Sequence, residues 1–253
     1  MAALPDPRER LIVALDTASL AGAEALADRL AGTVRWFKIG PHLFTASGPA
    51  AVAALLKRGK LFLDLKFHDI PSVVQSGVAT AARLGVSLCT VHALGGSAMM
   101  KAAQQGAGEG RADPARPRMR VIGVTLLTSA DAATLSEIGL EESPAAATVR
   151  LARLARGGEL DGVVVSPLDA AAVRNVCGPD FLLVCPGIRP KGVDAGDQRR
   201  TDTPAAAIAA GADMLVVGRA ITRATDPRAA AEEILRQIGN AVPRWVSETA
   251  RES

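Results

Sequence analysis

Short apolar runs alternate with longer segments of mixed character along the whole chain. Runs of about four to eight apolar residues are typical of buried strands, and apolar residues at helical spacing are typical of amphipathic helices. The pattern predicts eight strands, at Leu11–Leu15, Val34–Ile39, the start of Lys60–Pro71, Val86–Val91, Arg120–Thr125, Gly162–Val165, Phe181–Val184 and Met214–Val217. It also predicts helices at Thr17–Leu30, Pro49–Arg58, Ser72–Leu84, Ser97–Gln105, Ala130–Ile138, Pro144–Arg156, Asp169–Asn175, Thr203–Ala210 and Pro227–Ile238.

Eight strands that alternate with helices, with no linker between them, favour one domain over residues 1–253, a single (β/α)₈ or TIM barrel. A doubly wound open sheet is the alternative fold. The ends, residues 1–10 and 240–253, are expected to be flexible. The segment Gly106–Pro117 is rich in Gly, Pro and charge. Its spaced glycines follow no strand, so we expect a flexible loop there and not a nucleotide fingerprint.

Composition narrows the class of protein. Apolar residues make up 49% of the chain, enough for a substantial core, and the formal net charge is only +3. The absence of Tyr and of a Lys/Arg block argues against nucleic acid as a partner. Cys89, Cys177 and Cys185 show no CxxC spacing, so we expect a reducing, cytoplasmic location and no disulfide framework. The apolar runs are too short for a signal peptide or a membrane helix.

The stretch Lys60–Pro71 places charged residues where a buried strand should end. Alternate side chains of a strand share a face, so Asp64 and Lys66 are predicted to point the same way. Asp69 follows just beyond the strand. Charges on an apolar strand are costly unless they are paired or functional. A structural ion pair and a catalytic array of acid, lysine and acid both fit this spacing.

Polar residues gather at one end of the predicted strands. In a (β/α)₈ barrel these C-terminal ends share the face that carries the active site. Scattered surface charges would not sort in this way, so the arrangement favours the catalytic reading. The residues at or just beyond the strand ends are Asp16, Lys38, Asp64, Lys66, Asp69, His92, Thr128, Ser166, Arg189 and Arg219.

The last two strands carry a second signal. Gly218 and Arg219 stand at the start of a short helical turn after the eighth strand, where barrels commonly bind phosphate. The loop Pro186–Arg199 after the seventh strand is long, polar and rich in glycine, and it is a candidate lid. Arg189 and Gln198 in this loop can each donate to a phosphate. A merely solvated loop is the alternative.

Metal and nucleophile signals are weak. The three histidines, His42, His68 and His92, show no HxxxH spacing. Cys89 and His92 belong to one predicted strand but point to opposite faces by parity, which argues against a Cys–His dyad. We therefore expect no metal site and no cofactor.

Four motifs in order resemble the orotidine 5′-phosphate decarboxylases, especially the bacterial subgroup. They are Phe62–Pro71, Val124–Ser129, Pro186–Arg189 with Asp197–Arg200, and Val217–Ile221. The similarity extends from Leu11 to about Ile221. It implies decarboxylation of orotidine 5′-monophosphate to UMP and CO₂, the last step of pyrimidine synthesis, without cofactor or metal. It also implies a homodimer with sites at the subunit interface.

The resemblance assigns roles by matching positions. Lys38, Asp64, Lys66 and Asp69 match a charged tetrad, in which Asp69 reaches the neighbouring subunit's site and Lys66 protonates C6 of the pyrimidine. The expected substrate-binding positions are Asp16 at the ribose, Thr128 in the segment facing the pyrimidine, and Arg189, Gln198, Gly218 and Arg219 at the phosphate. One position departs from the family, because Ser72-Val73 stand where it usually has Asn-Thr. Val73 has no hydroxyl to offer across the subunit interface.

Two other functions remain open from the sequence. A magnesium-dependent hexulose-phosphate synthase or keto-gulonate-phosphate decarboxylase shares the spacing of the acid–lysine–acid array. A non-catalytic barrel that binds a nucleotide monophosphate is the rival from another class of protein.

Overall fold

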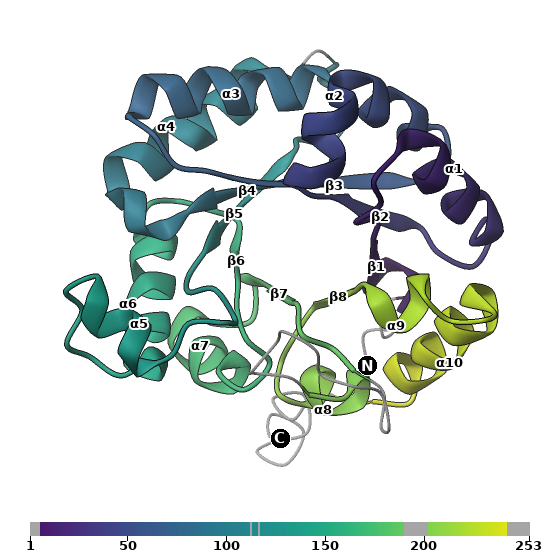
Figure 1. The fold of residues 1–253 in the computed structure, drawn as a ribbon. Helices are drawn as coiled ribbons and strands as arrows, with labels where there is room; N and C mark the ends of the chain where they lie inside the picture. The colour runs from purple at the N-terminus through teal and green to yellow at the C-terminus, as the bar shows by residue number, and fades with distance from the viewer. Residues whose placement is uncertain (1–5, 112, 116, 190–201, 242–253) are drawn as a thin grey trace.

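The strands close into a parallel barrel in sequence order (Figure 1). The computed structural model describes residues 6–111, 113–115, 117–189 and 202–241. The eight strands are β1 (Leu11–Ala14), β2 (Trp36–Ile39), β3 (Lys60–Phe67), β4 (Leu88–His92), β5 (Arg120–Val124), β6 (Gly162–Val164), β7 (Leu182–Cys185) and β8 (Met214–Val217). The predicted (β/α)₈ fold is confirmed, and the open-sheet alternative is wrong because β1 pairs with both β2 and β8.

Helices form a ring outside the barrel (Figure 1). They are α1 (Leu20–Arg29), α2 (Pro41–Leu56), α3 (Pro71–Arg83), α4 (Gly96–Glu109), α5 (Ala132–Glu137), α6 (Pro144–Gly157), α7 (Ala170–Cys177), α8 (Pro204–Ala209), α9 (Arg219–Thr222) and α10 (Pro227–Gly239), with short 3₁₀ turns at Pro7–Glu9 and Ala93–Gly95. No helix in the described part of the chain is long and apolar enough to span a membrane.

The helix predicted at Pro49–Arg58 is confirmed from Pro49 to Leu56, and a helical segment that was not predicted precedes it. Helix α2 starts at Pro41, whose fixed φ suits the first turn. At Gly48 the backbone turns to φ 54°, and Pro49 begins a second helical segment. Glycine adopts this conformation readily, so Gly48 separates two helical segments and Pro49 marks the start of the second, as predicted.

The loop predicted from Gly106 is wrong in its first four residues, because α4 continues to Glu109. Two glycines at helical spacing face helix α3. A Cβ at Gly106 would lie 2.3 Å from the carbonyl oxygen of Gln75, and one at Gly110 would lie 2.3 Å from that of Ala79. The glycines therefore allow the two helices to approach closely. Composition alone had suggested a loop at these positions.

The apolar residues form two layers, because alternate side chains of each strand point into and out of the barrel. The inner layer comprises Ile12, Ala14, Trp36, Phe62, Leu88, Ile122, Leu182, Val184, Met214 and Val216. The outer layer, between strands and helices, is larger and includes Val13, Phe37, Leu63, Cys89 and Val217. The rigid barrel that results fixes the strand ends on which the site is built.

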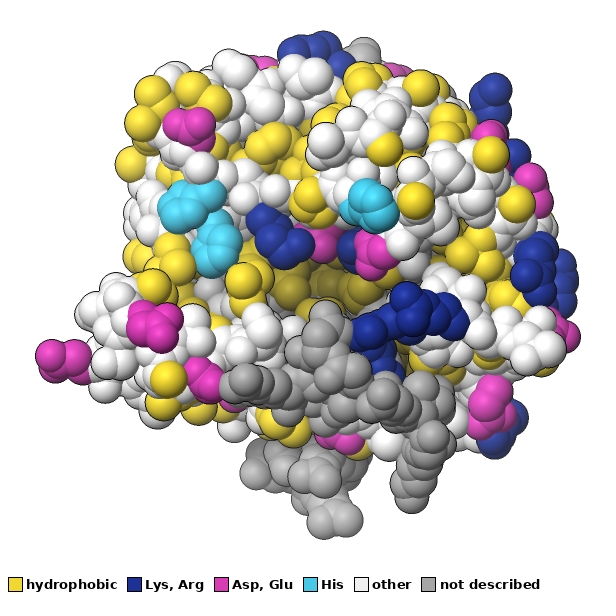
Figure 2. All heavy atoms as spheres, viewed as in Figure 1, with side chains coloured by type: hydrophobic (Ala, Val, Ile, Leu, Met, Phe, Trp, Pro, Cys, Tyr) yellow, Lys and Arg dark blue, Asp and Glu magenta, His cyan; other side chains and the backbone are white. Residues whose placement is uncertain are grey.

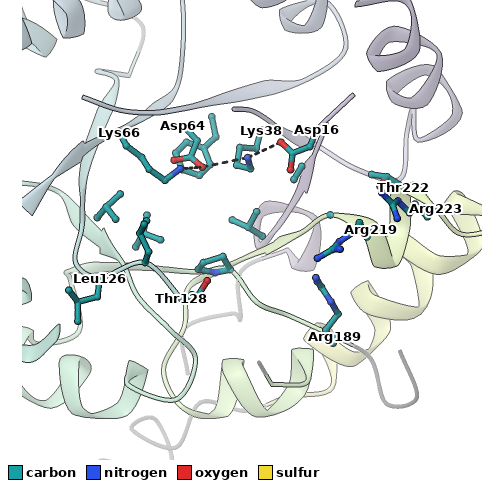
Figure 3. Close-up of a pocket in the computed structure, with 18 residues that line it drawn as sticks. Asp16, Lys38, Asp64, Lys66, Leu126, Thr128, Arg189, Arg219, Thr222 and Arg223 are labelled. Carbon is teal, nitrogen blue, oxygen red and sulfur yellow. Dashed lines mark hydrogen bonds and ion pairs between the residues drawn. The ribbon is translucent and has the colours of Figure 1, made fainter. Parts of the chain in front are cut away.

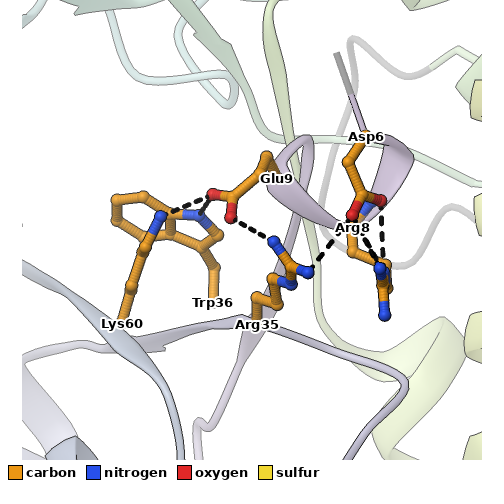
Figure 4. A network of polar contacts seen from close by, with 6 residues as sticks. All are labelled: Asp6, Arg8, Glu9, Arg35, Trp36 and Lys60. Atoms are coloured by element: carbon orange, nitrogen blue, oxygen red, sulfur yellow. Dashed lines mark hydrogen bonds and ion pairs between the residues drawn. The ribbon is translucent and has the colours of Figure 1, made fainter.

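A network of polar contacts closes the N-terminal end of the barrel (Figure 4). Glu9 accepts hydrogen bonds from Arg35 at 2.9 Å, from the indole nitrogen of Trp36 at 2.9 Å and from Lys60 at 2.8 Å. Arg10, 7% exposed, donates to the carbonyl oxygens of Ala212 and Asp213. Glu9 and Arg10 thus connect this end of the chain to the barrel. The single-domain organisation stays a prediction, as does the flexibility of residues 1–10 and 240–253.

Glu9 should make stability depend on pH. Its partial burial raises the pKa, but the hydrogen bonds from Lys60, Arg35 and Trp36 outweigh burial and hold the pKa at about 2. Between this value and the ordinary 4.5 the unfolded chain binds more protons, so the stabilisation is complete above pH 4.5 and is lost as the pH falls toward 2. We expect Glu9→Gln to lower the melting temperature at pH 7 by about 2–4 °C.

Calorimetric melting of wild type and Glu9→Gln at pH 7, 5, 4 and 3 checks this prediction. The difference between the two proteins should shrink as the pH falls. Glu137→Gln, a change at an exposed glutamate at the end of α5, is the control. It should alter neither the melting temperature at pH 7 nor its dependence on pH. A difference that stays constant down to pH 3 would remove Glu9 from the acid response.

Candidate active site

A pocket with a cavity volume of about 400 Å³ opens at the C-terminal ends of the strands. Figure 2 shows a hollow in this face in which Lys, Arg, Asp and Glu side chains gather over apolar ones. The described residues that line the pocket are Ala14, Asp16, Lys38, Phe62, Asp64, Lys66, Val124, Leu126, Leu127, Thr128, Val164, Pro186, Arg189, Val216, Gly218, Arg219, Thr222 and Arg223.

Four charged side chains, from the segment after β1 and from β2 and β3, form a row along one side of the pocket (Figure 3). Lys38 Nζ lies 3.3 Å from Asp16 Oδ1 and 3.5 Å from Asp64 Oδ2. Lys66 Nζ lies 3.0 Å from the same Oδ2 atom of Asp64. Asp64 and Lys38 are mostly buried, whereas a third of the Lys66 side chain is exposed. The prediction that Asp64 and Lys66 share a face is confirmed.

The carboxyl group of Asp64 is held in its charged form. Burial raises its pKa, but the ammonium groups of Lys38 and Lys66 and hydrogen bonds from Lys66 and Thr90 outweigh burial, so the pKa lies below its usual range. The ammonium groups of Lys38 and Lys66 balance the carboxylates of Asp64 and Asp16, so the row as a whole is formally neutral. Lys66, at the end of the row and partly exposed, presents an ammonium group that suits an anionic substrate group or a developing negative charge.

The opposite side of the pocket carries arginines. Arg189, which follows β7, and Arg219, the first residue of α9 after β8, converge on the cavity (Figure 3). Arg189 is only 8% exposed, and its guanidinium donates to the carbonyl oxygen of Ile188 at 2.9 Å. Gly218 lies at the same end, without a side chain to narrow the cavity. Planar guanidinium groups suit phosphate, which they can bind through two parallel hydrogen bonds.

The wall between the two charged sides is mainly apolar. Phe62, Val124, Leu126, Val164 and Val216 contribute to it. Thr128, in the segment after β5, brings a hydroxyl to this wall (Figure 3). A flat, mostly apolar group with few polar atoms fits such a surface.

Besides Asp69, two residues of the predicted polar face, His92 and Ser166, do not line the pocket. The ring of His92 stacks on that of His68 with centroids 5.3 Å apart. Burial, His68 and Lys66 lower the pKa of His92. Ser166 is 3% exposed and accepts a hydrogen bond from the backbone of Leu168. Both positions belong to strand ends, but their side chains serve local packing.

Asp69 and Gln198 stand apart from the other predicted site residues. Asp69 is exposed after β3, does not line the pocket, and accepts a hydrogen bond from the backbone nitrogen of Ile70 at 2.7 Å. Gln198 and the rest of the candidate lid beyond Arg189 lie outside the described residues. The roles assigned to Asp69 and Gln198 therefore stay predictions.

Sequence reasoning missed two residues of the arginine side, Thr222 and Arg223. They follow Arg219 by three and four positions, and helical residues at this spacing lie on the same face. Extending the helical turn past Ile221 would have found them.

The described part of the chain holds no group of three or more His, Cys, Asp or Glu side chains that could bind a metal ion. The three cysteines are free and buried. For Cys89 and Cys185 burial raises the pKa of the thiol far above its usual range, so neither is poised as a nucleophile.

Comparison with known proteins gives a consistent picture. The model of the family described as Orotidine 5′-phosphate decarboxylase / HUMPS family matches residues 9–234. The chain is 51% identical to Orotidine 5′-phosphate decarboxylase of Anaeromyxobacter sp. (strain K), over 90% of this chain and 97% of that protein. It is 47% identical to the enzyme of the same name from Trichlorobacter lovleyi, over 92% and 96%.

A solved structure is similar throughout. The crystal structure of Orotidine 5′-phosphate decarboxylase from Lactobacillus acidophilus superposes with a TM-score of 0.82 at 36% identity, covering 92% of this chain and 99% of that one. Full-length coverage excludes a similarity confined to the barrel scaffold. On the family match and these relatives, the chain belongs to the orotidine 5′-phosphate decarboxylase / HUMPS family.

Proposed function

We propose that the pocket converts orotidine 5′-monophosphate to UMP and CO₂, a carbon–carbon lyase reaction in pyrimidine synthesis. The observation that carries this proposal is the arrangement of the charges. A row of Lys38, Asp64 and Lys66 stands on one side of a cavity, and Arg189 and Arg219 stand on the other. A nucleotide that carries a carboxylate on its base and a phosphate on its ribose has the matching charges.

The substrate is proposed to lie across the barrel end. Its phosphate binds Arg189, Arg219 and Gly218, with Gln198 as a further donor from the lid. Its ribose hydroxyls meet Asp16 and Lys38, which are 3.3 Å apart. Its pyrimidine faces Thr128 and the apolar wall. This orientation directs the carboxylate at C6 toward Asp64 and Lys66.

Lys66 then acts as the proton donor. When the bond to the carboxylate breaks, CO₂ departs and the electron pair stays on C6. An ammonium group fixed beside C6 stabilises that charge more strongly in a pocket with little water than in bulk solvent. The same ammonium transfers its proton to C6 and gives UMP. Asp64, 3.0 Å from Lys66 Nζ, holds the ammonium in place, and its charge repels the carboxylate before the bond breaks.

A homodimer is proposed in which Asp69 completes the partner's pocket. Asp69 is exposed and outside its own pocket, and the apolar side chains beside it are exposed too, Ile70 by 63% and Val73 by 49%. Leu94, 39% exposed, also follows a strand that neighbours β3. A second subunit would cover this surface. Val73 would contribute an apolar contact there in place of the threonine hydroxyl of the family.

A cytoplasmic location also stays a prediction.

The phosphate assignment and the independence from metal are tested together. Wild-type protein in EDTA, without added cofactor, should convert orotidine 5′-monophosphate to UMP. If the protein does not convert orotidine 5′-monophosphate but acts on a pentulose phosphate once Mg²⁺ is added, the sugar-phosphate lyases are favoured instead. If it binds the nucleotide monophosphate without converting it, a non-catalytic sensor is favoured.

Under the same conditions Arg219→Ala should lower kcat/KM for orotidine 5′-monophosphate about 10- to 150-fold. A hydrogen-bonded charge pair is worth about 1.5–3 kcal/mol, which corresponds to that factor. The slow reaction of orotidine, which lacks phosphate, should change by less than about threefold. Arg228→Ala, at an arginine of α10 that contacts Ala31, is the control and should change neither reaction. Equal losses on both substrates would remove Arg219 from the phosphate site.

A further inference from the structure

The backbone that presents Lys66 is irregular. Leu63 of β3 pairs with Cys89 of β4, and Phe67 pairs with Val91, so three residues of β3 stand opposite the single residue Thr90. Within this bulge Lys66 has φ 54°, a left-handed conformation that side chains other than glycine rarely adopt. Strained backbone of this kind persists only where neighbouring groups hold it.

The side chain of Thr90 is placed to hold it. Thr90 is fully buried on β4. Its hydroxyl accepts a hydrogen bond from the backbone nitrogen of Lys66 at 2.9 Å and donates one to Asp64 Oδ1 at 3.0 Å. The other oxygen of Asp64 faces the ammonium groups of Lys66 and Lys38. One hydroxyl therefore connects the strained backbone of Lys66 with the carboxylate that binds its ammonium group.

We propose that Thr90 is a positioning residue for the decarboxylation. Its hydroxyl fixes the left-handed turn at Lys66 and the rotation of the Asp64 carboxylate, and so determines where the Lys66 ammonium meets C6 of the substrate. Thr90 is not among the described residues that line the pocket, so it is proposed to act through Lys66 and Asp64 and not by contact with the substrate. The inference rests on the proposed function of Lys66 and Asp64, and it adds a residue that acts through both.

The direction of the hydrogen bonds supports this role. The backbone nitrogen of Lys66 can only donate, so the Thr90 oxygen must accept and its proton is free to point at Asp64. Valine has nearly the shape of threonine but can neither donate nor accept. In Thr90→Val the Lys66 nitrogen is buried without this partner, and Asp64 loses the hydrogen bond that orients its Oδ1 atom.

The test is a steady-state comparison of Thr90→Val and Thr90→Ser. A displacement of about 1 Å of a catalytic group can cost about 100-fold, so kcat of Thr90→Val should fall by about that factor. KM, and the Kd of UMP measured by calorimetry, should change less than about threefold, because the phosphate and the pyrimidine bind elsewhere in the pocket. Thr90→Ser keeps the hydroxyl and should retain kcat within about threefold.

Thr148→Val is the matched control. Thr148 is buried in α6, and no described residue hydrogen-bonds its hydroxyl. The same chemical change there should leave kcat and KM as in wild type. A general loss of activity from replacing a buried threonine would appear in this variant as well.

The outcomes separate the two levels of the proposal. If Lys66→Ala is inactive but folded Thr90→Val keeps kcat within about threefold of wild type, the positioning role is wrong and the role of Lys66 stands. If Lys66→Ala itself is active, the proposed function of Lys66 fails first. If Thr90→Val does not fold, Thr90→Cys replaces it, because a thiol is a weak donor and acceptor. A kcat of Thr90→Cys equal to that of Thr90→Ser would then overturn the proposal.

Discussion

Replacing Lys66 by alanine is expected to lower kcat by at least about 10⁴-fold while UMP still binds. General acid catalysis by a positioned side chain contributes about 10²–10⁴-fold, and a preorganised charge at the reacting atom contributes a further 10²–10³-fold. Both contributions come from one ammonium group, 3.0 Å from Asp64 and partly exposed to the cavity. The proposed phosphate contacts of Arg189 after β7 and Arg219 after β8 remain, so the Kd of UMP should rise less than about tenfold.

Turnover of orotidine 5′-monophosphate and calorimetric binding of UMP measure the two parts of this prediction. Lys57→Ala removes an exposed lysine after α2, outside the pocket, and should leave both values unchanged. The structural ion pair that the sequence left open makes a different prediction, in which Lys66→Ala lowers the melting temperature and keeps the rate. A wild-type-like kcat in the folded variant would contradict the role of Lys66 as proton donor.

The strands and most of the pocket could be predicted because their signals are local. Most strands are apolar runs with a polar residue at or shortly after their end, and closure of the barrel brings those ends to one face. Strand alternation predicted that Asp64 and Lys66 share a face, and the two side chains do meet, although a bulge in β3 interrupts that alternation. Arg189 and Arg219 could be placed from the glycines and the strand ends beside them.

What the sequence could not predict depends on the contact between distant segments. Thr90 stands in an otherwise apolar run, and only the register shift between β3 and β4 brings it to Lys66. Gly106 and Gly110 lie in a glycine-rich stretch that is typical of a loop, but they are required there because helix α3 packs too closely for a side chain. In both cases the partner lies more than twenty residues away, so no local pattern carries the information.

Mixing inactive Lys66→Ala and Asp69→Ala chains is expected to restore about a quarter of the wild-type activity. If Asp69 completes the partner's pocket, a hybrid dimer has one intact pocket and one that lacks both residues. Half of the dimers in an equal random mixture are hybrids, and half of their pockets are intact, which gives about one quarter. Hybrids isolated with two affinity tags should reach about half.

The control uses two residues of one pocket. Lys66 and Asp64 are 3.0 Å apart in the same chain, so mixing Lys66→Ala with Asp64→Ala leaves every pocket of the hybrid without one of them. No activity should return in that mixture. Confirmed Lys66→Ala and Asp69→Ala hybrids that stay inactive would place Asp69 in its own chain's chemistry. Activity that returns only when Lys66→Ala is mixed with Asp69→Ala would instead explain why exposed Asp69 lies beside exposed apolar side chains after β3. The acid and the apolar side chains would then belong to the interface that completes the pocket.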